Sequence, residues 1–301
     1  MSPSLAPSDD TFVLADLSPS PRLFVGTQPF GPLEINCRQP VLIPRPETEH
    51  LFEQFSQLLV ETLGQSQRRG AAAPLKILDL CTGTGCIALL LRHRLNEAEI
   101  HAEITAVDKS QAAVSLALHN KQACARIRYD ASNSSSVQKM TPLQRLHDAR
   151  RRDLSSSYAR VYVERVNIFD DDAIDRLIYS NGPFDVIASN PPYVTAEEWK
   201  TLDKTVRNWE DSDALIGDTE DSQDGLAFYR RIALLIERTG ILTPNPTSSK
   251  MPSLLVEVGH TQAKAVQDLF IATGHFSKTE LIEDQWQKQR GVMAWSRSSR
   301  Q

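Results

Sequence analysis

The sequence lacks the features of several protein classes. No apolar run approaches the ~20 residues that a helix needs to cross a bilayer, so we do not expect a membrane protein. The four cysteines form no CxxC pair and no metal-binding spacing, which predicts reduced thiols and no zinc site. The seven histidines make no HxxxH pair and no triad, so neither metal nor nucleophilic catalysis is indicated.

Basic residues are scarce at the start of the chain. Residues 1–22 are rich in Ser, Pro and Asp, and Arg22 is their only basic residue. A secretory signal needs a basic start and an apolar stretch of ~7–15 residues, and a mitochondrial presequence is rich in Arg and poor in acids. Neither pattern is visible, so we expect residues 1–22 to form a disordered leader.

The net charge of the 301-residue chain is −5, from 33 Lys and Arg against 38 Asp and Glu, and it is unevenly spread. It provides no overall field for a nucleic-acid backbone. Residues 126–165 hold 9 basic and 4 acidic residues, whereas residues 197–224 hold 3 basic and 10 acidic ones and are expected to form a surface loop near the site. We expect flexible, solvated insertions at about 126–160 and 243–252. A contact of the basic stretch with nucleic acid or the ribosome is the alternative.

The sequence does contain an alternation of apolar runs and helical periodicity. Residues 23–45 predict a β-hairpin and a connector. Strands are then expected at 76–79, 104–108, 161–163, 184–189 and 254–258, and helices from 46 and at 86–95, 111–121, 226–237 and 262–272. Strands that alternate with helices form parallel sheets covered on both faces. The expected fold of residues 46–301 is therefore a single α/β domain with a doubly wound, mostly parallel sheet.

A glycine-rich turn joins the first buried strand of this domain to the next helix, at residues 79–86 (DLCTGTGC). Gly83 and Gly85 let a ligand approach the backbone, and the helix start that follows offers unpaired N–H groups to an anion. Asp108 ends the next strand, where an acid binds ribose hydroxyls in doubly wound folds. Ala88 replaces the third glycine of the dinucleotide fingerprint, which favours a mononucleoside such as S-adenosylmethionine over NAD.

A second motif, Asn190-Pro191-Pro192-Tyr193, follows the strand expected at 184–189. The two prolines stiffen the turn and leave Asn190 at the carboxyl edge of the sheet, where open α/β sheets bind ligands. A carboxamide oxygen and a nearby backbone carbonyl together hold a planar –NH2 group by its two hydrogens, which aligns the nitrogen with a methyl donor. Tyr193 would pack against the planar substrate. A plain strand-ending turn is the alternative interpretation.

With these motifs the chain resembles the HemK/PrmC-type protein-glutamine N5-methyltransferases. The matching segments are VLIPRPETE at 41–49, ILDLCTGTG at 77–85, AVDKS at 106–110, FDVIASNPPYV at 184–194, GLAFYRRI at 225–232 and LLVEVG at 254–259. The resemblance implies the Rossmann-like fold of S-adenosylmethionine-dependent methyltransferases. It also implies methylation of the side-chain amide of the glutamine in the GGQ motif of class 1 peptide chain release factors. NPPY alone is shared with adenine-N6 methyltransferases, so its pairing with IPRPETE carries the specificity.

The resemblance further implies roles for individual residues. The methyl-transfer site would consist of Asn190, Pro191, Pro192 and Tyr193. The cofactor-binding residues would be Asp79, Cys81, Thr82, Gly83, Thr84, Gly85, Asp108, Ile168, Phe169 and Asn190. The substrate pocket would be closed by Arg45, Pro46, Glu47 and Thr48, with a structural ion pair between Arg45 and Glu47 as the alternative. The resemblance implies no metal.

Several positions depart from the family pattern and keep other functions open. Cys81 stands where the family usually has Gly, Ile168 replaces an aromatic neighbour of the adenine, and Asp211 replaces the proline of a Glu-Pro pair. The family's small helical N-terminal domain has no counterpart. One alternative is therefore a truncated, non-catalytic homologue that acts as a binding protein. Another is an adenine-N6 or other nucleic-acid methyltransferase, because of NPPY and the basic stretch.

The compartment also follows from the resemblance. The Ser-rich insertions suggest a eukaryotic member, and eukaryotic members that resemble the bacterial form act in mitochondria. Because residues 1–22 show no presequence, the cytoplasm is the alternative.

Overall fold

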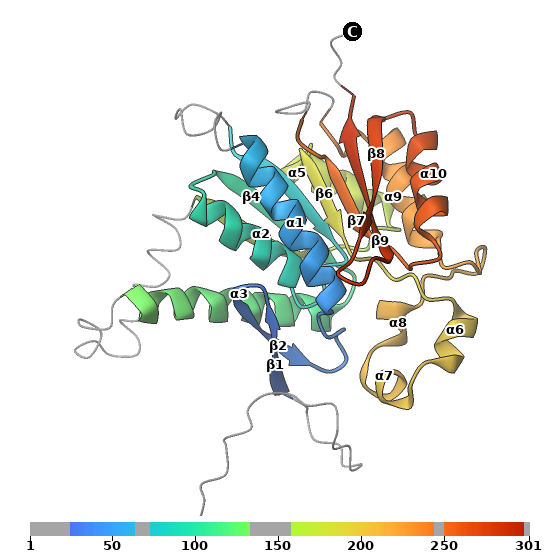
Figure 1. Ribbon diagram of the computed structural model, residues 1–301, viewed down its shortest axis with the longest axis horizontal. Helices are drawn as coiled ribbons and strands as arrows, with labels where there is room; N and C mark the ends of the chain where they lie inside the picture. The colour runs from blue at the N-terminus through green and yellow to red at the C-terminus, as the bar shows by residue number, and fades with distance from the viewer. Residues whose placement is uncertain (1–24, 64–72, 133–157, 244–249, 298–301) are drawn as a thin grey trace, which may run out of the picture.

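Seven strands form one sheet at the centre of the protein, between two layers of helices (Figure 1). The computed structural model describes residues 25–63, 73–132, 158–243 and 250–297, except for the side chains of Val25 and of 126–132. The strands, in their order across the sheet, are β5 (Ala159–Arg165), β4 (Ala102–Asp108), β3 (Leu75–Leu80), β6 (Val186–Ser189), β7 (Leu254–Glu257), β9 (Gln289–Ser296) and β8 (Phe276–Glu283). The first five are parallel to one another, and β9 runs antiparallel to both of its neighbours.

The central strands are buried on both faces, which explains their continuous apolar runs. Every residue of β6 and of β7 is buried, and so are five of the six residues of β3. Parallel sheets need helices on both faces for this reason. One face is covered by α1 (Pro46–Leu63), α2 (Cys86–Glu97) and α3 (Gln111–Ser132), and the other by α5 (Asp171–Asn181), α9 (Ala227–Arg238) and α10 (Ala263–Ala272).

The direction in which strands are added to the sheet reverses at β3. The chain proceeds from β3 to β4 and β5, and then returns to β6 on the other side of β3. In open α/β sheets, ligands bind outside the carboxyl ends of the strands at such a point. Leu80, the last residue of β3, pairs with Ser189, the last residue of β6. The glycine loop and the NPPY turn therefore start side by side.

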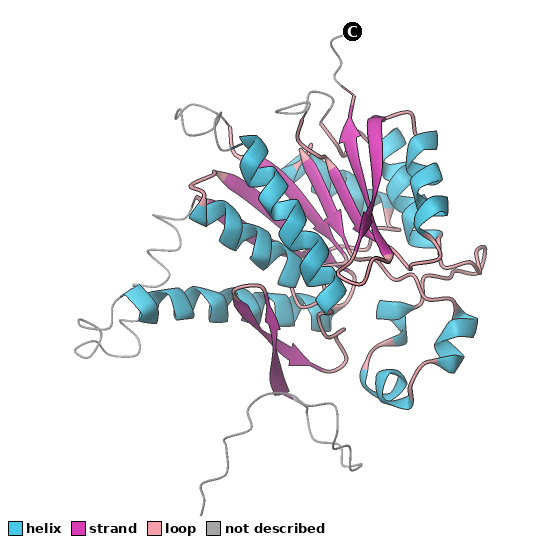
Figure 2. Ribbon diagram, in the orientation of Figure 1, coloured by secondary structure: helices cyan, strands magenta, loops and turns pink. Residues whose placement is uncertain are grey.

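A separate two-stranded sheet, β1 (Val25–Phe30) and β2 (Leu33–Arg38), packs on α3 (Figure 2). Asn120 of α3 is fully buried there. Its Oδ1 accepts a hydrogen bond from the backbone N–H of Asn36, and its Nδ2 donates to the backbone carbonyls of Asn36 and Thr84, each at 3.0 Å. One side chain therefore connects the hairpin to the loop that follows β3.

The structure contains the predicted hairpin, the five predicted strands and the five predicted helices of the α/β domain. The predicted fold class is therefore confirmed. Two predictions were wrong in detail. The helix predicted at 111–121 continues to Ser132, into the range predicted as a flexible insertion, because residues 122–128 are mostly good helix formers. The acidic stretch 197–224, predicted as a surface loop, contains three short helices: α6 (Ala196–Thr201), α7 (Lys204–Trp209) and α8 (Ser212–Leu215). The side chain of the Thr or Asp that precedes each helix caps its N-terminus.

The leader predicted at 1–22 and most of the two predicted insertions, 133–157 and 244–249, lie outside the described residues. The division of the chain into leader, hairpin and catalytic domain therefore stays a prediction. Within the described ranges, no helix is long and apolar enough to cross a membrane. The same ranges contain no group of three His, Cys, Asp or Glu side chains placed to hold a metal ion.

Candidate active site

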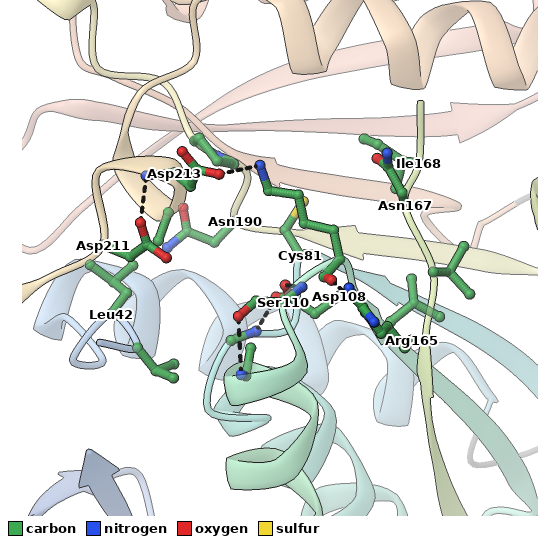
Figure 3. A pocket seen from close by; sticks show the side chains of 18 of the residues that line it. Leu42, Cys81, Asp108, Ser110, Arg165, Asn167, Ile168, Asn190, Asp211 and Asp213 are labelled. Atoms are coloured by element: carbon green, nitrogen blue, oxygen red, sulfur yellow. Dashed lines mark hydrogen bonds and ion pairs between the residues drawn. The ribbon is translucent and has the colours of Figure 1, made fainter. Parts of the chain in front are cut away.

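A cavity of about 360 Å³ lies at the carboxyl ends of β3, β4 and β6 (Figure 3). Its volume is within the range of small-molecule sites. Six of the residues predicted for the cofactor or the chemistry line it, namely Cys81, Gly83, Asp108, Ile168, Asn190 and Pro192. Five residues predicted for the cofactor lie outside its lining, namely Asp79, Thr82, Thr84, Gly85 and Phe169. The carboxyl edge of the sheet therefore brings the glycine loop, the acid after β4 and the NPPY turn around one space.

The loop after β3 turns sharply, and its glycines have structural reasons. The φ angle is +54° at Gly83 and +82° at Gly85, values that L side chains rarely adopt. A Cβ on Gly85 would stand 3.1 Å from the Cβ of Ala117, so α3 packs directly against the loop. Cys81 has a φ of +60°, which costs a residue with a side chain on the order of 1 kcal/mol. The glycine expected at this position by the family pattern would avoid that cost.

The two acids near the loop are held in different ways. Asp108 accepts backbone hydrogen bonds from Gly83 at 3.0 Å and from Ser110 at 2.9 Å, one on each carboxylate oxygen. Each oxygen can accept a further hydrogen bond, so the carboxylate fits a pair of ribose hydroxyls in the cavity that it lines. Asp79 lies fully buried beneath the loop and accepts from the Thr82 hydroxyl at 2.5 Å. Burial raises the pKa of Asp79 to about 7, and it also raises the pKa of Asp108.

Two glycines hold the backbone of the turn after β6. A Cβ on Gly217 would stand 2.6 Å from the carbonyl oxygen of Pro192, and a Cβ on Gly225 would stand 2.3 Å from the carbonyl oxygen of Tyr193. The Gln262 side chain donates to the same Tyr193 carbonyl at 2.9 Å. The turn is therefore held by close backbone contacts with Gly217 and Gly225 and by a hydrogen bond from the start of α10.

Asn190 lines both the large cavity and a second, smaller one of about 30 Å³. The small cavity is also lined by Leu42, Arg45, Pro191, Pro192, Tyr193, Ala214, Leu215 and Glu257. The Asn190 Nδ2 donates to the Thr48 hydroxyl at 3.2 Å, and that hydroxyl donates to the Glu257 carboxylate at 2.5 Å. Of the four residues predicted to close the substrate pocket, Arg45 lines the small cavity, whereas Pro46, Glu47 and Thr48 line neither.

Arg45 forms an ion pair with Glu210, not with Glu47 as in the alternative interpretation of the sequence. One guanidinium nitrogen lies 2.7 Å from both Glu210 oxygens, and the Glu210 side chain is 3% exposed. Burial raises the pKa of Glu210, and the Arg45 charge opposes that rise. The next residue, Asp211, donates its backbone N–H to the Pro40 carbonyl at 2.8 Å, a hydrogen bond that a proline at this position could not make.

The aromatic lining of the cavity comes from a different residue than the sequence predicts. Ile168 lines the cavity and is 4% exposed, but Phe169 is 41% exposed and lies outside the lining. The Phe169 ring packs edge-on against Phe228 of α9, with 5.0 Å between ring centroids, and Phe228 does line the cavity. Phe169 therefore contacts the wall of the cavity from behind.

Several residues that sequence reasoning missed lie in segments that it had matched without giving them roles. Lys109 and Ser110 belong to AVDKS, Phe228 to GLAFYRRI and Glu257 to LLVEVG. Asp213 carries no such signal, because α8 is too short to show a periodicity. It lines the large cavity and forms an ion pair with Lys109 at 2.9 Å.

Known proteins resemble the chain over most of its length. A protein named release factor glutamine methyltransferase from Thermodesulfovibrio yellowstonii is 30% identical over 262 residues, which are 86% of this chain and 70% of that protein. A protein of the same name from Agrobacterium fabrum is 31% identical over 86% of this chain and 68% of that protein. This chain belongs to the release factor glutamine methyltransferase family. Its fold is the Rossmann-like fold of S-adenosylmethionine-dependent methyltransferases, as predicted.

Coverage varies among the other members of the family. The Schizosaccharomyces pombe member, named probable MRF1 mitochondrial N(5)-glutamine methyltransferase, is 33% identical over 81% of this chain and 65% of its own length. The chain spans 54% of the Chlorobaculum tepidum member. No family model matches the chain. Among solved structures, the catalytic domain of human Mettl16 with an RNA hairpin covers 89% of this chain and 76% of its own, at 17% identity and a TM-score of 0.49.

Proposed function

We propose that this protein transfers a methyl group from S-adenosylmethionine to the side-chain amide nitrogen of the glutamine in the GGQ motif of a class 1 peptide chain release factor. The observation that carries the proposal is the place of Asn190, which lines both the large cavity and the small one beside it. A side chain at that junction contacts the target amide while the amide faces the methyl donor. The names of the relatives support the reaction and the kind of partner.

The large cavity suits the cofactor. Asp108 would accept hydrogen bonds from the ribose hydroxyls, and Ile168 and Phe228 would pack against the adenine. Gly83 lets a ligand approach the backbone of the loop closely. The nearest atom to a Cβ built on Gly83 belongs to the Val41 side chain, 3.9 Å away. When bound, S-adenosylmethionine supplies an electrophilic methyl group on a sulfonium.

The small cavity suits a glutamine side chain. An amide nitrogen is a weak nucleophile because its lone pair is delocalised into the carbonyl. The Asn190 carboxamide oxygen and the Pro191 backbone carbonyl would each accept one hydrogen of the –NH2 group, which polarises both N–H bonds and fixes the direction of the lone pair. Tyr193 would pack against the flat amide, and Arg45 would close the pocket. After methyl transfer the amide nitrogen is positively charged and strongly acidic. It loses a proton to water, so no general base is required.

The partner and the compartment follow from the same family. A GGQ loop has to enter the small cavity, so we propose a class 1 release factor as the partner. The S. pombe relative is named as mitochondrial, whereas bacterial relatives carry the same activity in their names. We propose a mitochondrial location for this chain, with the cytoplasm as the alternative. Imaging of the full chain, tagged at its carboxyl end, separates the two.

The test uses the full chain, methyl-labelled S-adenosylmethionine and a purified GGQ release factor. We expect label on the Gln of GGQ, located by mass spectrometry, and none on a factor whose motif is GGA. Asn190→Ala should lower the rate by about 100-fold or more, a much larger effect than the one on cofactor affinity, to which Asn190 adds one contact among many in the large cavity. Label on adenine in nucleic acid in place of the factor would overturn the proposal in favour of a nucleic-acid methyltransferase. Cofactor binding without label on any of these would favour a non-catalytic binding protein.

A further inference from the structure

Three polar side chains from separate elements meet at the wall of the small cavity, which Asn190 and Glu257 line and Thr48 does not. Thr48 lies in the first turn of α1, Glu257 ends β7, and Asn190 follows β6. Thr48 and Glu257 are each 2% exposed. The Asn190 Nδ2 lies 3.2 Å from the Thr48 Oγ1, which lies 2.5 Å from the Glu257 Oε2. The two hydrogen bonds form a relay that ends on the residue at the junction of the two cavities.

Glu257 sets the direction of both hydrogen bonds in this relay. A carboxylate has no hydrogen to donate, so the Thr48 hydroxyl must donate its hydrogen to Glu257. The Thr48 oxygen is then an acceptor for Asn190, and the –NH2 end of the carboxamide must face it. The carboxamide oxygen of Asn190 is thereby left to accept a hydrogen bond from another molecule.

We infer that Glu257, acting through Thr48, is a positioning residue that selects the orientation in which Asn190 presents its oxygen to the target amide. The inference rests on the proposed function, because the orientation matters only if an –NH2 group has to be held. A carboxamide turned by 180° presents its own N–H donors to the substrate N–H that the Asn190 oxygen would otherwise accept. No hydrogen bond then forms between the two amides, and only the Pro191 carbonyl is left to accept from the substrate.

The protonation state of Glu257 decides whether the relay keeps its direction. Burial raises the pKa of Glu257 to about 7, against the lowering effect of the Thr48 hydrogen bond and of Arg290. The charged and titratable groups that face it from the neighbouring elements are Arg45, Glu47, Tyr193, Tyr229 and Arg290. A protonated Glu257 can donate to Thr48, and Thr48 can then donate to Asn190. We therefore expect the methyl-transfer rate to fall as the pH decreases through about 7.

The test compares four variants of the full chain in the labelling assay with a GGQ release factor. Thr48→Val removes the hydroxyl but keeps the shape, and we expect kcat to fall by about 10- to 100-fold. Thr48→Ser keeps the hydroxyl and should recover most of that rate. Glu257→Gln should lose the dependence of the rate on pH near 7. The matched control is Thr62→Val on the same helix, whose hydroxyl donates to the Leu58 carbonyl at 2.8 Å and takes no part in the relay.

Two further measurements separate positioning from general damage. The affinity for S-adenosylmethionine, measured by calorimetry, should stay within about twofold of the native value in all four variants, because none of Thr48, Glu257 and Thr62 lines the large cavity. Thr48→Val in the Asn190→Ala background should be no slower than Asn190→Ala alone, because the relay acts only through Asn190. If Thr48→Val fails to fold, the pH profile of Glu257→Gln decides.

The results that would overturn the inference are equally specific. One is a methyl-transfer rate of Thr48→Val equal to that of Thr62→Val. Another is a variant with both Thr48→Val and Asn190→Ala whose loss of rate is the product of the two single losses. The third is a pH dependence of the rate near 7 that persists in Glu257→Gln. Any of these, with native protein that labels the release factor, refutes the relay alone. A native protein that labels no release factor refutes the proposed function, and the relay with it.

Discussion

The carbonyl oxygen of Tyr193 occupies the place where a side chain on Gly225 would begin. A Cβ on Gly225 would stand 2.3 Å from that oxygen, and the φ angle of Gly225 is +70°. The contact couples the turn that holds Asn190 to a residue two positions before the start of α9. It gives a structural reason for the glycine that opens the GLAFYRRI segment.

Gly225→Ala should therefore lower activity as well as stability. The new methyl group has to displace the backbone of the NPPY turn, and we expect a loss of about 2–3 kcal/mol in the free energy of unfolding. We also expect a fall of about 10-fold or more in methyl transfer. Gly240→Ala is the matched control, because Gly240 also has a positive φ, +64°, but nothing within 4 Å of its Cβ position. Equal effects of the two variants in urea unfolding and labelling assays would contradict the steric explanation.

Asn120→Ala should loosen the hairpin and the glycine loop together. Asn120 is fully buried and bonds to the backbone of Asn36 and of Thr84. Its loss leaves buried backbone groups without partners, so we expect a cost of about 2–4 kcal/mol in the free energy of unfolding and weaker S-adenosylmethionine binding. Denaturant unfolding and calorimetry measure the two effects. Asn181→Ala, which removes an exposed hydrogen bond to Glu164, should change stability by no more than about 0.5 kcal/mol.

The sequence was most informative for elements whose own residues determine their secondary structure and burial. β3, β6 and β7 are buried on both faces and are therefore visible as short apolar runs. The meeting of the glycine loop with the NPPY turn also follows from the sequence, because parallel strands bring their carboxyl ends to one edge. α6, α7 and α8 were missed because four to six residues are too few for a periodicity.

Contacts between distant segments were not predictable in this way. Thr48, Asn190 and Glu257 come from three separate motifs, and their hydrogen bonds connect residues 142 and 209 positions apart. No pattern of apolar residues reports such a pairing. The sequence also offered Arg45 a near neighbour as its partner, whereas the fold supplies Glu210, 165 positions away. The residues of the site were recognisable one by one, but the partners that orient them required the tertiary structure.

Arg45→Ala should lower the free energy of unfolding more than the replacement of both Arg45 and Glu210 does. The Glu210 side chain is 3% exposed, so removal of Arg45 leaves a buried charge without its counterion. Because Arg45 itself is 34% exposed, solvent screens part of the effect, and we expect a loss of about 2 kcal/mol in the free energy of unfolding. Arg45→Met with Glu210→Met should recover part of that loss. Chemical denaturation of the single and double variants measures the coupling, and simple additivity would contradict it.

The KM for the release factor should rise in Arg45→Ala, because Arg45 lines the small cavity and its ion pair joins the segment before α1 to the segment before α8. The affinity for S-adenosylmethionine should change less, since Arg45 does not line the large cavity. Steady-state labelling at varied concentrations of each substrate separates the two constants. A larger effect on the cofactor than on the release factor would contradict this assignment of the two cavities.

Asp79 should make the cofactor-free protein less stable as the pH rises. Burial raises its pKa from 3.8 to about 7, so between these values the folded state binds more protons than the unfolded state. The stability that this group contributes is present below about pH 4 and is lost as the pH rises through about 7. The free energy of unfolding of the native protein, minus that of Asp79→Asn, should therefore fall between pH 4 and pH 8, by on the order of 3 kcal/mol.

An exposed aspartate with the opposite shift provides the control for this pH dependence. The Thr205 hydroxyl and backbone N–H donate to Asp203 and lower its pKa, so its contribution is present at neutral pH and is lost as the pH falls. The corresponding difference for Asp203→Asn should rise with pH only below about pH 4 and stay level between pH 4 and pH 8, where that for Asp79→Asn falls. Urea unfolding at several pH values measures both. If the Asp79→Asn difference stays constant, Asp79 is ionised in the folded protein throughout, and the loop after β3 stabilises a buried negative charge.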